Sequence, residues 1–292
     1  MKEIGSYNRA SRVDEALELA AEFGGDGEFI AGGQSLTNLM KQRLVGDDIH
    51  LIDISDLDLD FVRVEDGVVR IGALNTHADL LESDIVAEHL PRLAEMIEQV
   101  ADAQIRNAGT IGGDVAHADP SSDYPIFLAA VDASYRIRSP DGTRTIGSER
   151  FFDGYFRTDL ASDEILTEVR IPVPPDDAET GFSKFARRKG DFALVNAAAA
   201  LTFDADAVSE ARIRVGGVGG MPTRPADAEE YLEGRSSDRA DPETVGDVAA
   251  EEITPDVDER TSREYKEKLV GAMVRRSVGR CLDARQGGDR TW

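Results

Sequence analysis

The chain has 292 residues, of which 41% are hydrophobic, so it can bury a large core and form two or three subdomains. Its 57 acidic residues against 33 basic ones give a net charge of −24, which argues against nucleic acid as a partner. No segment approaches the roughly 18 apolar residues of a membrane span, and the amino terminus lacks the apolar core of a signal peptide, so we expect a cytoplasmic protein.

The acidic excess is spread along the chain and is not confined to one tail. This pattern is typical of halophilic, salt-adapted proteins, although an ordinary acidic protein remains an alternative. Cysteine usage restricts the redox centres, because the single Cys281 excludes an internal disulfide and a cluster held by about four thiolates. The four histidines are scattered, and His117 with Asp119 is the nearest approach to a ligand pair, so we expect no metal site.

The first segment predicts a small βαβ unit over residues 1–57. An amphipathic helix over 11–23 ends at Gly24-Gly25, and strands are expected at 29–31 and 50–54.

A glycine turn, Gly32-Gly33-Gln34-Ser35, lies between the first of these strands and a predicted helix over 36–44. Ser35 is placed to cap that helix. A strand, a glycine turn and a capped helix together direct free amides toward an anion.

The second segment, residues 58–175, contains two predicted hairpins, at 61–71 and 134–146, and a strand at 164–171. Thr76 caps a predicted short helix, and Pro91 opens another.

Between these hairpins lies a second glycine loop, Asn107-Ala-Gly-Thr-Ile-Gly-Gly-Asp114. Thr110 offers a hydroxyl, and the amides around Gly112 and Gly113 have no side chain to shield them, which suits phosphate oxygens. A purely structural glycine-rich turn is the alternative. Two such loops favour a ligand with two phosphates over a coincidence of turns.

A proline cluster at 172–175 marks the predicted start of a carboxy-terminal domain over 176–284, followed by a tail at 285–292. Strands are expected at 194–203 and 211–215, an acidic helical region at 227–259 and a closing helix at 264–282. The glycine-rich run after Arg214 lacks the third glycine of a dinucleotide fingerprint and is followed by prolines, so we assign it to a strand and turn.

Two motifs, Ala31-Gly-Gly-Gln-Ser-Leu36 and Gln104-Ile-Arg-Asn-Ala-Gly-Thr-Ile-Gly-Gly-Asp114, resemble the FAD loops of the flavoprotein (medium) subunit of the molybdenum hydroxylases. This is the carbon monoxide and xanthine dehydrogenase family, and the similarity extends to about Ala284. The resemblance implies an α+β fold, in which an FAD-binding domain of two α/β lobes (PCMH/VAO-like) precedes a carboxy-terminal domain of sheet and helices. It places the FAD diphosphate between the loops, at Ala31, Gly32, Gly33, Gln34, Ser35, Leu36, Thr110, Ile111, Gly112, Gly113 and Asp114. Many relatives have histidine at the position of Gln34.

The resemblance also assigns residues to the flavin itself. Asp123 corresponds to an aspartate that hydrogen-bonds the flavin, Lys184 to a lysine near the ring, and Ile165 and Leu166 to the strand that places an apolar residue against it. The alternatives are an acid that favours its own helix dipole for Asp123 and a solvated strand face for Lys184. Phe192 corresponds to an aromatic residue near the isoalloxazine, but a core position is the simpler interpretation.

The resemblance implies an FAD-carrying oxidoreductase subunit that transfers electrons and needs no catalytic acid or base of its own. Its implied partners are a molybdopterin-binding large subunit and a [2Fe–2S] small subunit, in a dimer of heterotrimers. Two alternatives stay open: a self-contained FAD-dependent oxidoreductase, and a scaffold that has lost FAD. The substrate and the electron acceptor stay open as well.

Overall fold

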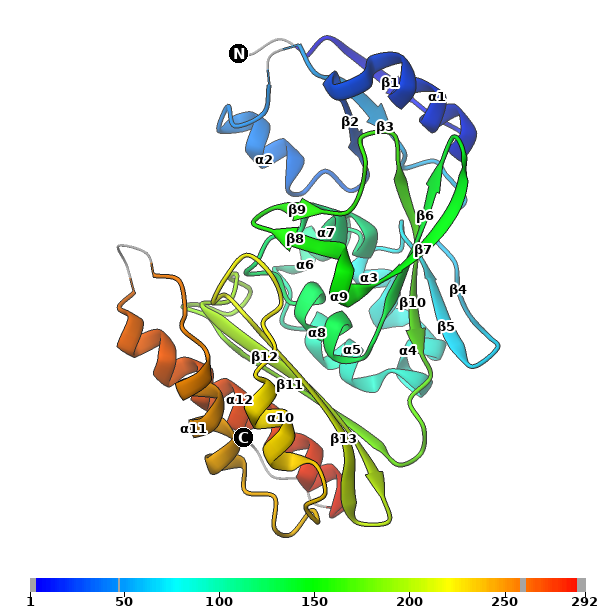
Figure 1. Cartoon of the computed structure of the whole chain (residues 1–292). Helices are drawn as coiled ribbons and strands as arrows, with labels where there is room; N and C mark the ends of the chain where they lie inside the picture. Colours follow the sequence, from blue (N-terminus) through cyan, green and yellow to red (C-terminus); the bar gives the residue numbers. More distant parts are fainter. Residues whose placement is uncertain (1–3, 47, 258–260, 288–292) are drawn as a thin grey trace.

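A computed structural model describes residues 4–46, 48–257 and 261–287 (Figure 1). Within them the chain forms three larger sheets, which follow one another along the long axis of the molecule, and one two-stranded sheet. The predicted α+β fold is confirmed. The last five residues of the predicted tail, 288–292, lie outside the described residues.

The first lobe is a three-stranded parallel sheet with helices, as the βαβ prediction requires. Its elements are β1 (Ser6–Arg9), α1 (Val13–Phe23), a 3₁₀ turn η1 (Gly24–Asp26), β2 (Gly27–Ile30), α2 (Leu36–Lys41) and β3 (His50–Asp53). The strand order is β1-β3-β2, so β3 is central and its Ile52 is fully buried. The apolar stripe of α1, which includes Leu17, packs into the same core, and Gly24 ends the helix with a φ of 56°.

The second lobe is a five-stranded antiparallel sheet in the order β4-β5-β10-β6-β7, with most of its helices between β5 and β6 in the chain. Its elements are β4 (Val62–Glu65), β5 (Val68–Gly72), α3 (His77–Glu82), α4 (Asp84–His89), α5 (Pro91–Ile97), α6 (Ala103–Arg106), α7 (Ile111–His117), α8 (Tyr124–Ala130), β6 (Ser134–Ser139), β7 (Gly142–Gly147), α9 (Ser148–Phe151), β8 (Phe152–Gly154), β9 (Arg157–Thr158) and β10 (Ile165–Pro172). Both predicted hairpins form. Strand β10 enters the sheet between them.

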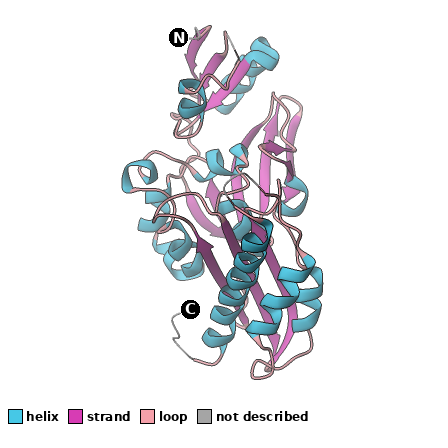
Figure 2. Ribbon diagram, turned by 90° about the vertical axis from the view of Figure 1, so that its left-hand side faces the viewer, coloured by secondary structure: helices cyan, strands magenta, loops and turns pink. Residues whose placement is uncertain are grey.

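The carboxy-terminal region is a three-stranded antiparallel meander covered by helices on one face (Figure 2). Its elements are β11 (Ala178–Phe185), β12 (Val195–Asp204), β13 (Ala207–Gly216), α10 (Ala226–Leu232), α11 (Pro242–Glu252) and α12 (Arg263–Arg285). The acidic region predicted as helical holds α10 and α11, and its last two residues lie outside the described part. The glycine-rich run after Arg214 is the end of β13 and a turn, as predicted.

Apolar cores join the three parts. Phe182 of β11 and Ala198 of β12 belong to the same core as the second lobe, next to helix α8. Ile165 of β10 joins the core of the first lobe together with Leu59 and Leu74. The second lobe therefore packs against both of its neighbours, and the two glycine loops lie on parts that are packed together.

Candidate functional site

The first glycine loop connects β2 to α2 and keeps its amides free. The five consecutive backbone N–H groups from Gly32 to Leu36 donate to no acceptor among the described residues. The carbonyl of Gly32 accepts from Nε2 of Gln34 at 2.8 Å, and Gly33 has a φ of 67°, which suits glycine. Successive free amides at a turn form a concavity that binds anions. We call the amides of residues 32–36 the amide cradle.

The predicted cap of α2 is confirmed in position but not in its hydrogen bond. Ser35 occupies the N-cap position, but its side chain makes no capping hydrogen bond. Thr37 instead turns its hydroxyl to the carbonyl of Gly33. The hydroxyl of Ser35 is therefore not used by the helix.

The second glycine loop is different, because its amides are already used. Gly112 donates to the carbonyl of Ala73 at 2.9 Å, and Gly113 donates to the hydroxyl of Thr110 at 3.1 Å. The amides of the two flanking residues bond to backbone carbonyls as well. The prediction of unshielded amides around Gly112 and Gly113 is therefore wrong: α7 begins here, Thr110 caps it, and the segment that follows β5 supplies acceptors. Of residues 107–114, Thr110 alone keeps an amide without an acceptor in the described chain.

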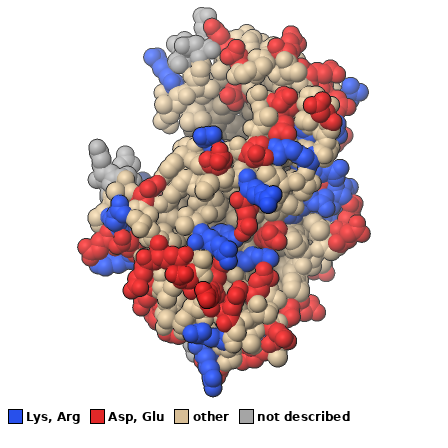
Figure 3. All heavy atoms as spheres, in the orientation of Figure 1, with Lys and Arg blue, Asp and Glu red and all other residues tan. Residues whose placement is uncertain are grey.

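The two loops touch each other. A Cβ atom at Gly32 would lie 1.7 Å from the carbonyl oxygen of Ala108 and 3.0 Å from Cα of Gly109. Only glycine allows this approach, so the second loop supports the amide cradle from behind. The outline of the molecule is indented on the left of Figure 3, between the α2 side of the first lobe and the rest of the chain.

Behind the second loop lies a buried histidine that the sequence did not single out. The amide of His77 donates to the carbonyl of Gly109 at 3.0 Å, and its Nδ1 lies 2.9 Å from the hydroxyl of Tyr124. Burial, reinforced by the charge of Arg106, lowers the pKa of His77 to about 4. The ring is therefore neutral at pH 7. In the sequence, His77 directly follows the predicted helix cap Thr76, and this position was the feature that could have indicated its role.

Asp123 and Lys184, assigned separately from the sequence, form one buried ion pair. Nζ of Lys184 lies 2.6 Å from Oδ2 of Asp123, and the Lys184 side chain is only 6% exposed. The alternative of a solvated strand face for Lys184 is therefore wrong. Nδ2 of Asn196 donates to the other carboxylate oxygen at 2.7 Å. Burial raises the pKa of Asp123, and the ammonium of Lys184 and the amide of Asn196 oppose that rise. Asn196 was also missed, although a polar residue at the start of the apolar run of β12 could have indicated it.

Asp114 belongs to the same cluster of charges. Its Oδ1 accepts from the hydroxyl of Ser122 at 2.5 Å. Burial raises the pKa of Asp114 to about 7, the hydroxyl of Ser122 opposes the rise, and the neighbouring charges of Asp123 and Asp119 add to it.

The two apolar residues assigned to the flavin ring are buried in the hydrophobic cores. Ile165 is 3% exposed in the core of the first lobe, and Leu166 is 5% exposed in the core of the second. Their role against a ring stays a prediction. Phe192 is 59% exposed, so the core interpretation of this residue is wrong.

His117 and Asp119 show no metal arrangement. The ring of His117 packs on Phe156, with 5.2 Å between centroids. Within residues 4–46, 48–257 and 261–287, no three His, Cys, Asp or Glu side chains are grouped to hold a metal ion. The same residues contain no helix that is long and apolar enough to cross a membrane. Cys281 is buried in α12, and burial raises the pKa of its thiol.

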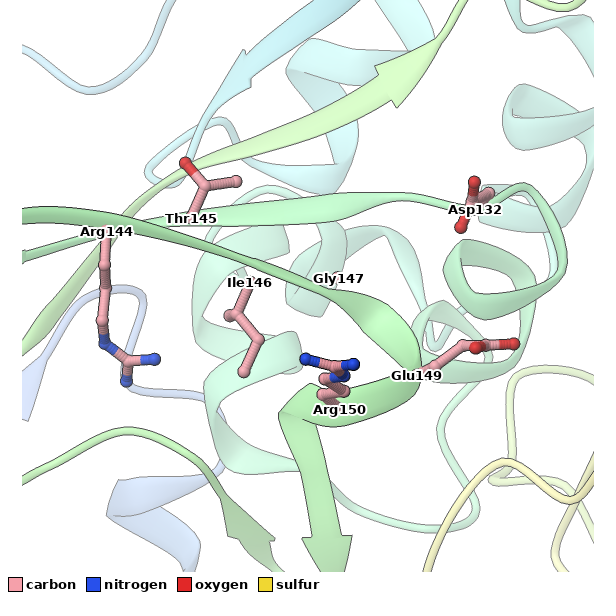
Figure 4. A pocket seen from close by; sticks show the side chains of 7 residues that line it. All are labelled: Asp132, Arg144, Thr145, Ile146, Gly147, Glu149 and Arg150. Atoms are coloured by element: carbon pink, nitrogen blue, oxygen red, sulfur yellow. The ribbon is translucent and has the colours of Figure 1, made fainter.

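A pocket of about 360 Å³ lies elsewhere, at the end of β7 and the start of α9 (Figure 4). It contains none of the predicted site residues. Its charged side chains do not converge, and most of them already have partners: Arg144 pairs with Glu164, Glu149 with Arg214 and Asp132 with Arg212. We therefore assign it no function.

A parallel lobe that carries an amide cradle, buttressed by the glycine loop of an antiparallel lobe, defines a protein that binds a phosphate-bearing cofactor. Comparison with known families identifies the cofactor. A family described as "FAD binding domain in molybdopterin dehydrogenase" matches residues 2–174, and "CO dehydrogenase flavoprotein C-terminal domain" matches residues 180–281. The chain belongs to this family of flavoprotein subunits. It is an oxidoreductase subunit, and its cofactor is FAD, so these predictions are confirmed.

Individual relatives are similar to this chain over nearly its whole length. The chain is 36% identical to the nicotine 6-hydroxylase medium subunit of Paenarthrobacter nicotinovorans, over 93% of this chain and 95% of that protein. It is 34% identical to the carbon monoxide dehydrogenase medium chain of Hydrogenophaga pseudoflava, with the same coverage. A solved structure of carbon monoxide dehydrogenase from that organism superimposes with a TM-score of 0.92 at 35% identity, covering 98% of this chain and 99% of the other. The structure of quinoline 2-oxidoreductase from Pseudomonas putida 86 superimposes with a TM-score of 0.91 at 32% identity, covering 98% of this chain and 99% of the other.

Proposed function

We propose that this chain is the FAD-carrying electron-transfer subunit of a molybdenum hydroxylase complex. It takes electrons from the iron–sulfur clusters of a partner and passes them to an external acceptor. The observation that carries the proposal is the amide cradle, whose five free N–H groups can hold a diphosphate. The relatives named as medium chains of dehydrogenases and of a hydroxylase support the assignment to a complex of several subunits.

In this proposal the amides of Gly32, Gly33, Gln34, Ser35 and Leu36 hold the diphosphate, and Ala31 leads the chain into the turn. The second loop contributes the amide of Thr110. Its other predicted residues, Ile111, Gly112, Gly113 and Asp114, shape the support through their own hydrogen bonds. Gln34 serves the turn by tying its side chain to the carbonyl of Gly32.

Bound FAD would supply the redox chemistry, accepting electrons and releasing them to the acceptor. The residues of this chain orient it and set its electrostatic surroundings. Lys184 would place a cation near the ring, Asp123 would balance that cation, and Ile165 and Leu166 would supply an apolar surface to the ring. No acid or base of the chain needs to act in the transfer.

The proposed partners rest on the relatives named as medium chains of multi-subunit enzymes. The single cysteine of this chain cannot hold an iron–sulfur cluster, so FAD is the redox centre that it brings to the complex. A molybdopterin-binding large subunit and a [2Fe–2S] small subunit supply the rest, in a dimer of heterotrimers in the cytoplasm. Within the chain we propose that residues 1–57 and 58–175 form the two FAD-binding lobes and that residues 176–284 form the carboxy-terminal domain.

The test is substrate-driven reduction of the flavin. The purified chain should carry oxidised FAD that dithionite reduces, while purines, aldehydes and carbon monoxide leave its visible spectrum unchanged. Adding the iron–sulfur and molybdenum subunits should allow the matching substrate to bleach the flavin. Turnover of such a substrate by the single chain would contradict the proposal and support a self-contained oxidoreductase.

A further inference from the structure

Three residues form a row across the carboxy-terminal sheet next to Asp123. Lys184 on β11, Asn196 on β12 and Gly216 on β13 are direct partners in the strand register. Paired residues on neighbouring strands project from the same face of a sheet. Nζ of Lys184 and Nδ2 of Asn196 therefore reach the two oxygens of one carboxylate, at 2.6 and 2.7 Å.

The amide of Asn196 has one favourable orientation. The residue is fully buried, and its Nδ2 also donates to the carbonyl of Ser122 at 3.1 Å. Its Oδ1 faces Gly216, where a Cβ atom would lie 2.2 Å away. Rotating the amide would turn its oxygen toward the carboxylate of Asp123, and the two acceptors would repel each other.

This orientation leaves Oδ1 of Asn196 without a hydrogen-bond donor in the described part of the chain. A buried acceptor without a donor lowers the stability of the folded state, so its presence calls for an explanation. The explanation that the contacts offer is the Asp123–Lys184 pair, which this amide holds in place.

The row is linked to the amide cradle by a series of contacts. Gly32 packs on Gly109, and the carbonyl of Gly109 accepts from the amide of His77. His77 bonds to Tyr124, which follows Asp123 in the chain. The pair is therefore connected, through Tyr124, His77 and Gly109, to the loops that we assign to FAD.

We propose that Asn196 is a positioning residue that holds the carboxylate of Asp123 ionised against Lys184 and thereby sets the reduction potential of the bound FAD. This inference rests on the proposed function, in which Lys184 lies beside the flavin ring. With the carboxylate ionised, the pair has no net charge. A net positive charge near the ring favours the reduced, more negative flavin, and a net negative charge opposes it.

The midpoint potential of the FAD-loaded full chain tests this, by anaerobic titration with reference dyes. Asn196→Asp places a second carboxyl group beside that of Asp123, and at high pH, where both are ionised, the added negative charge should lower the potential relative to the wild type. Asn196→Leu removes one hydrogen bond to the carboxylate of Asp123, which raises the pKa of that carboxyl further; its larger protonated fraction leaves the charge of Lys184 less fully balanced, and the potential should rise. We expect each shift to reach a tenfold change in the equilibrium constant of two-electron reduction, about 30 mV.

Ser183→Ala is the matched control. Ser183 is a buried neighbour on β11 whose hydroxyl has no hydrogen-bond partner within the described residues, so its loss should leave the potential unchanged. In an Asp123→Asn background the effect of Asn196→Leu should vanish, because no carboxylate is left to position. If Asn196→Leu does not fold, Asn196→Asp, which keeps the size of the side chain, carries the test alone.

Unchanged potentials with FAD retained would overturn the inference, and so would shifts of the same sign in both variants. The titration needs no partner subunit. Its failure is therefore distinguishable from a failure of the proposed electron transfer, which is measured by substrate-driven bleaching.

Discussion

Replacing Gly32 by alanine should weaken FAD binding by forcing the two glycine loops apart. The added Cβ would lie 1.7 Å from the carbonyl oxygen of Ala108, whereas real Cβ contacts stay beyond about 3.0 Å, so the loops must separate by about 1.3 Å. Overpacking of this kind costs about 1–3 kcal/mol. If the cost falls on the bound state, the Kd for FAD rises between about 5- and 150-fold.

The assay is the FAD content of the purified chain together with FAD titration followed by flavin fluorescence. Gly25→Ala is the matched control, because a Cβ there has open space around it and the backbone has no positive φ. A thermal melt of the same samples separates lost affinity from lost stability. A Gly32→Ala protein with the Kd and the melting temperature of the wild type would refute the contact between the loops.

Three further outcomes follow from the charges. The pKa of His77 is about 4 in the folded chain and 6.5 as a free side chain, so between these values the unfolded state binds the extra proton. The free energy of unfolding should therefore fall by about 3 kcal/mol between pH 6.5 and pH 4. A His77→Phe variant whose free energy of unfolding falls equally steeply with pH would contradict this. Asp114 has the opposite effect: its pKa in the folded chain is raised to about 7, so its contribution to the free energy of unfolding decreases as the pH rises. Asp114→Asn should therefore be more stable than the wild type at pH 7, and an equal or lower melting temperature would argue against this. Since the net charge is −24 and acidic side chains are spread over the face in Figure 3, the melting temperature should rise from 0.1 M to about 1 M salt, and a flat profile would remove the halophilic interpretation.

The fold could be predicted from the sequence wherever one local pattern decided it. The amphipathic period of residues 11–23 and the closing glycine fixed α1, and the turn at Ser139–Gly142 fixed the hairpin of β6 and β7. Boundaries were less certain, since α12 runs from Arg263 to Arg285 where 264–282 was expected. Helix ends depend on caps and tertiary contacts that a periodic pattern does not contain.

The site was predicted only in part, because some of its contacts are local in the sequence and others join residues far apart along the chain. The free amides of the first loop follow from a local turn and were expected. The used amides of the second loop were not, because Gly112 donates to Ala73, which lies 39 residues earlier. Nothing near residue 112 shows that acceptor.

The same limit applies to the buried charges. Asp123 and Lys184 are 61 residues apart, and Asn196 joins them only because β11 and β12 pair in one register. A resemblance to a family could name the first two residues one at a time. It could not show that they neutralise each other.

A structure of the chain with FAD bound tests the central claim most directly. The account predicts diphosphate oxygens within about 3.2 Å of several backbone nitrogens of residues 32–36, with the second loop contributing Thr110 and not Gly112. A diphosphate held by other groups, with the amides of residues 32–36 facing solvent, would contradict it.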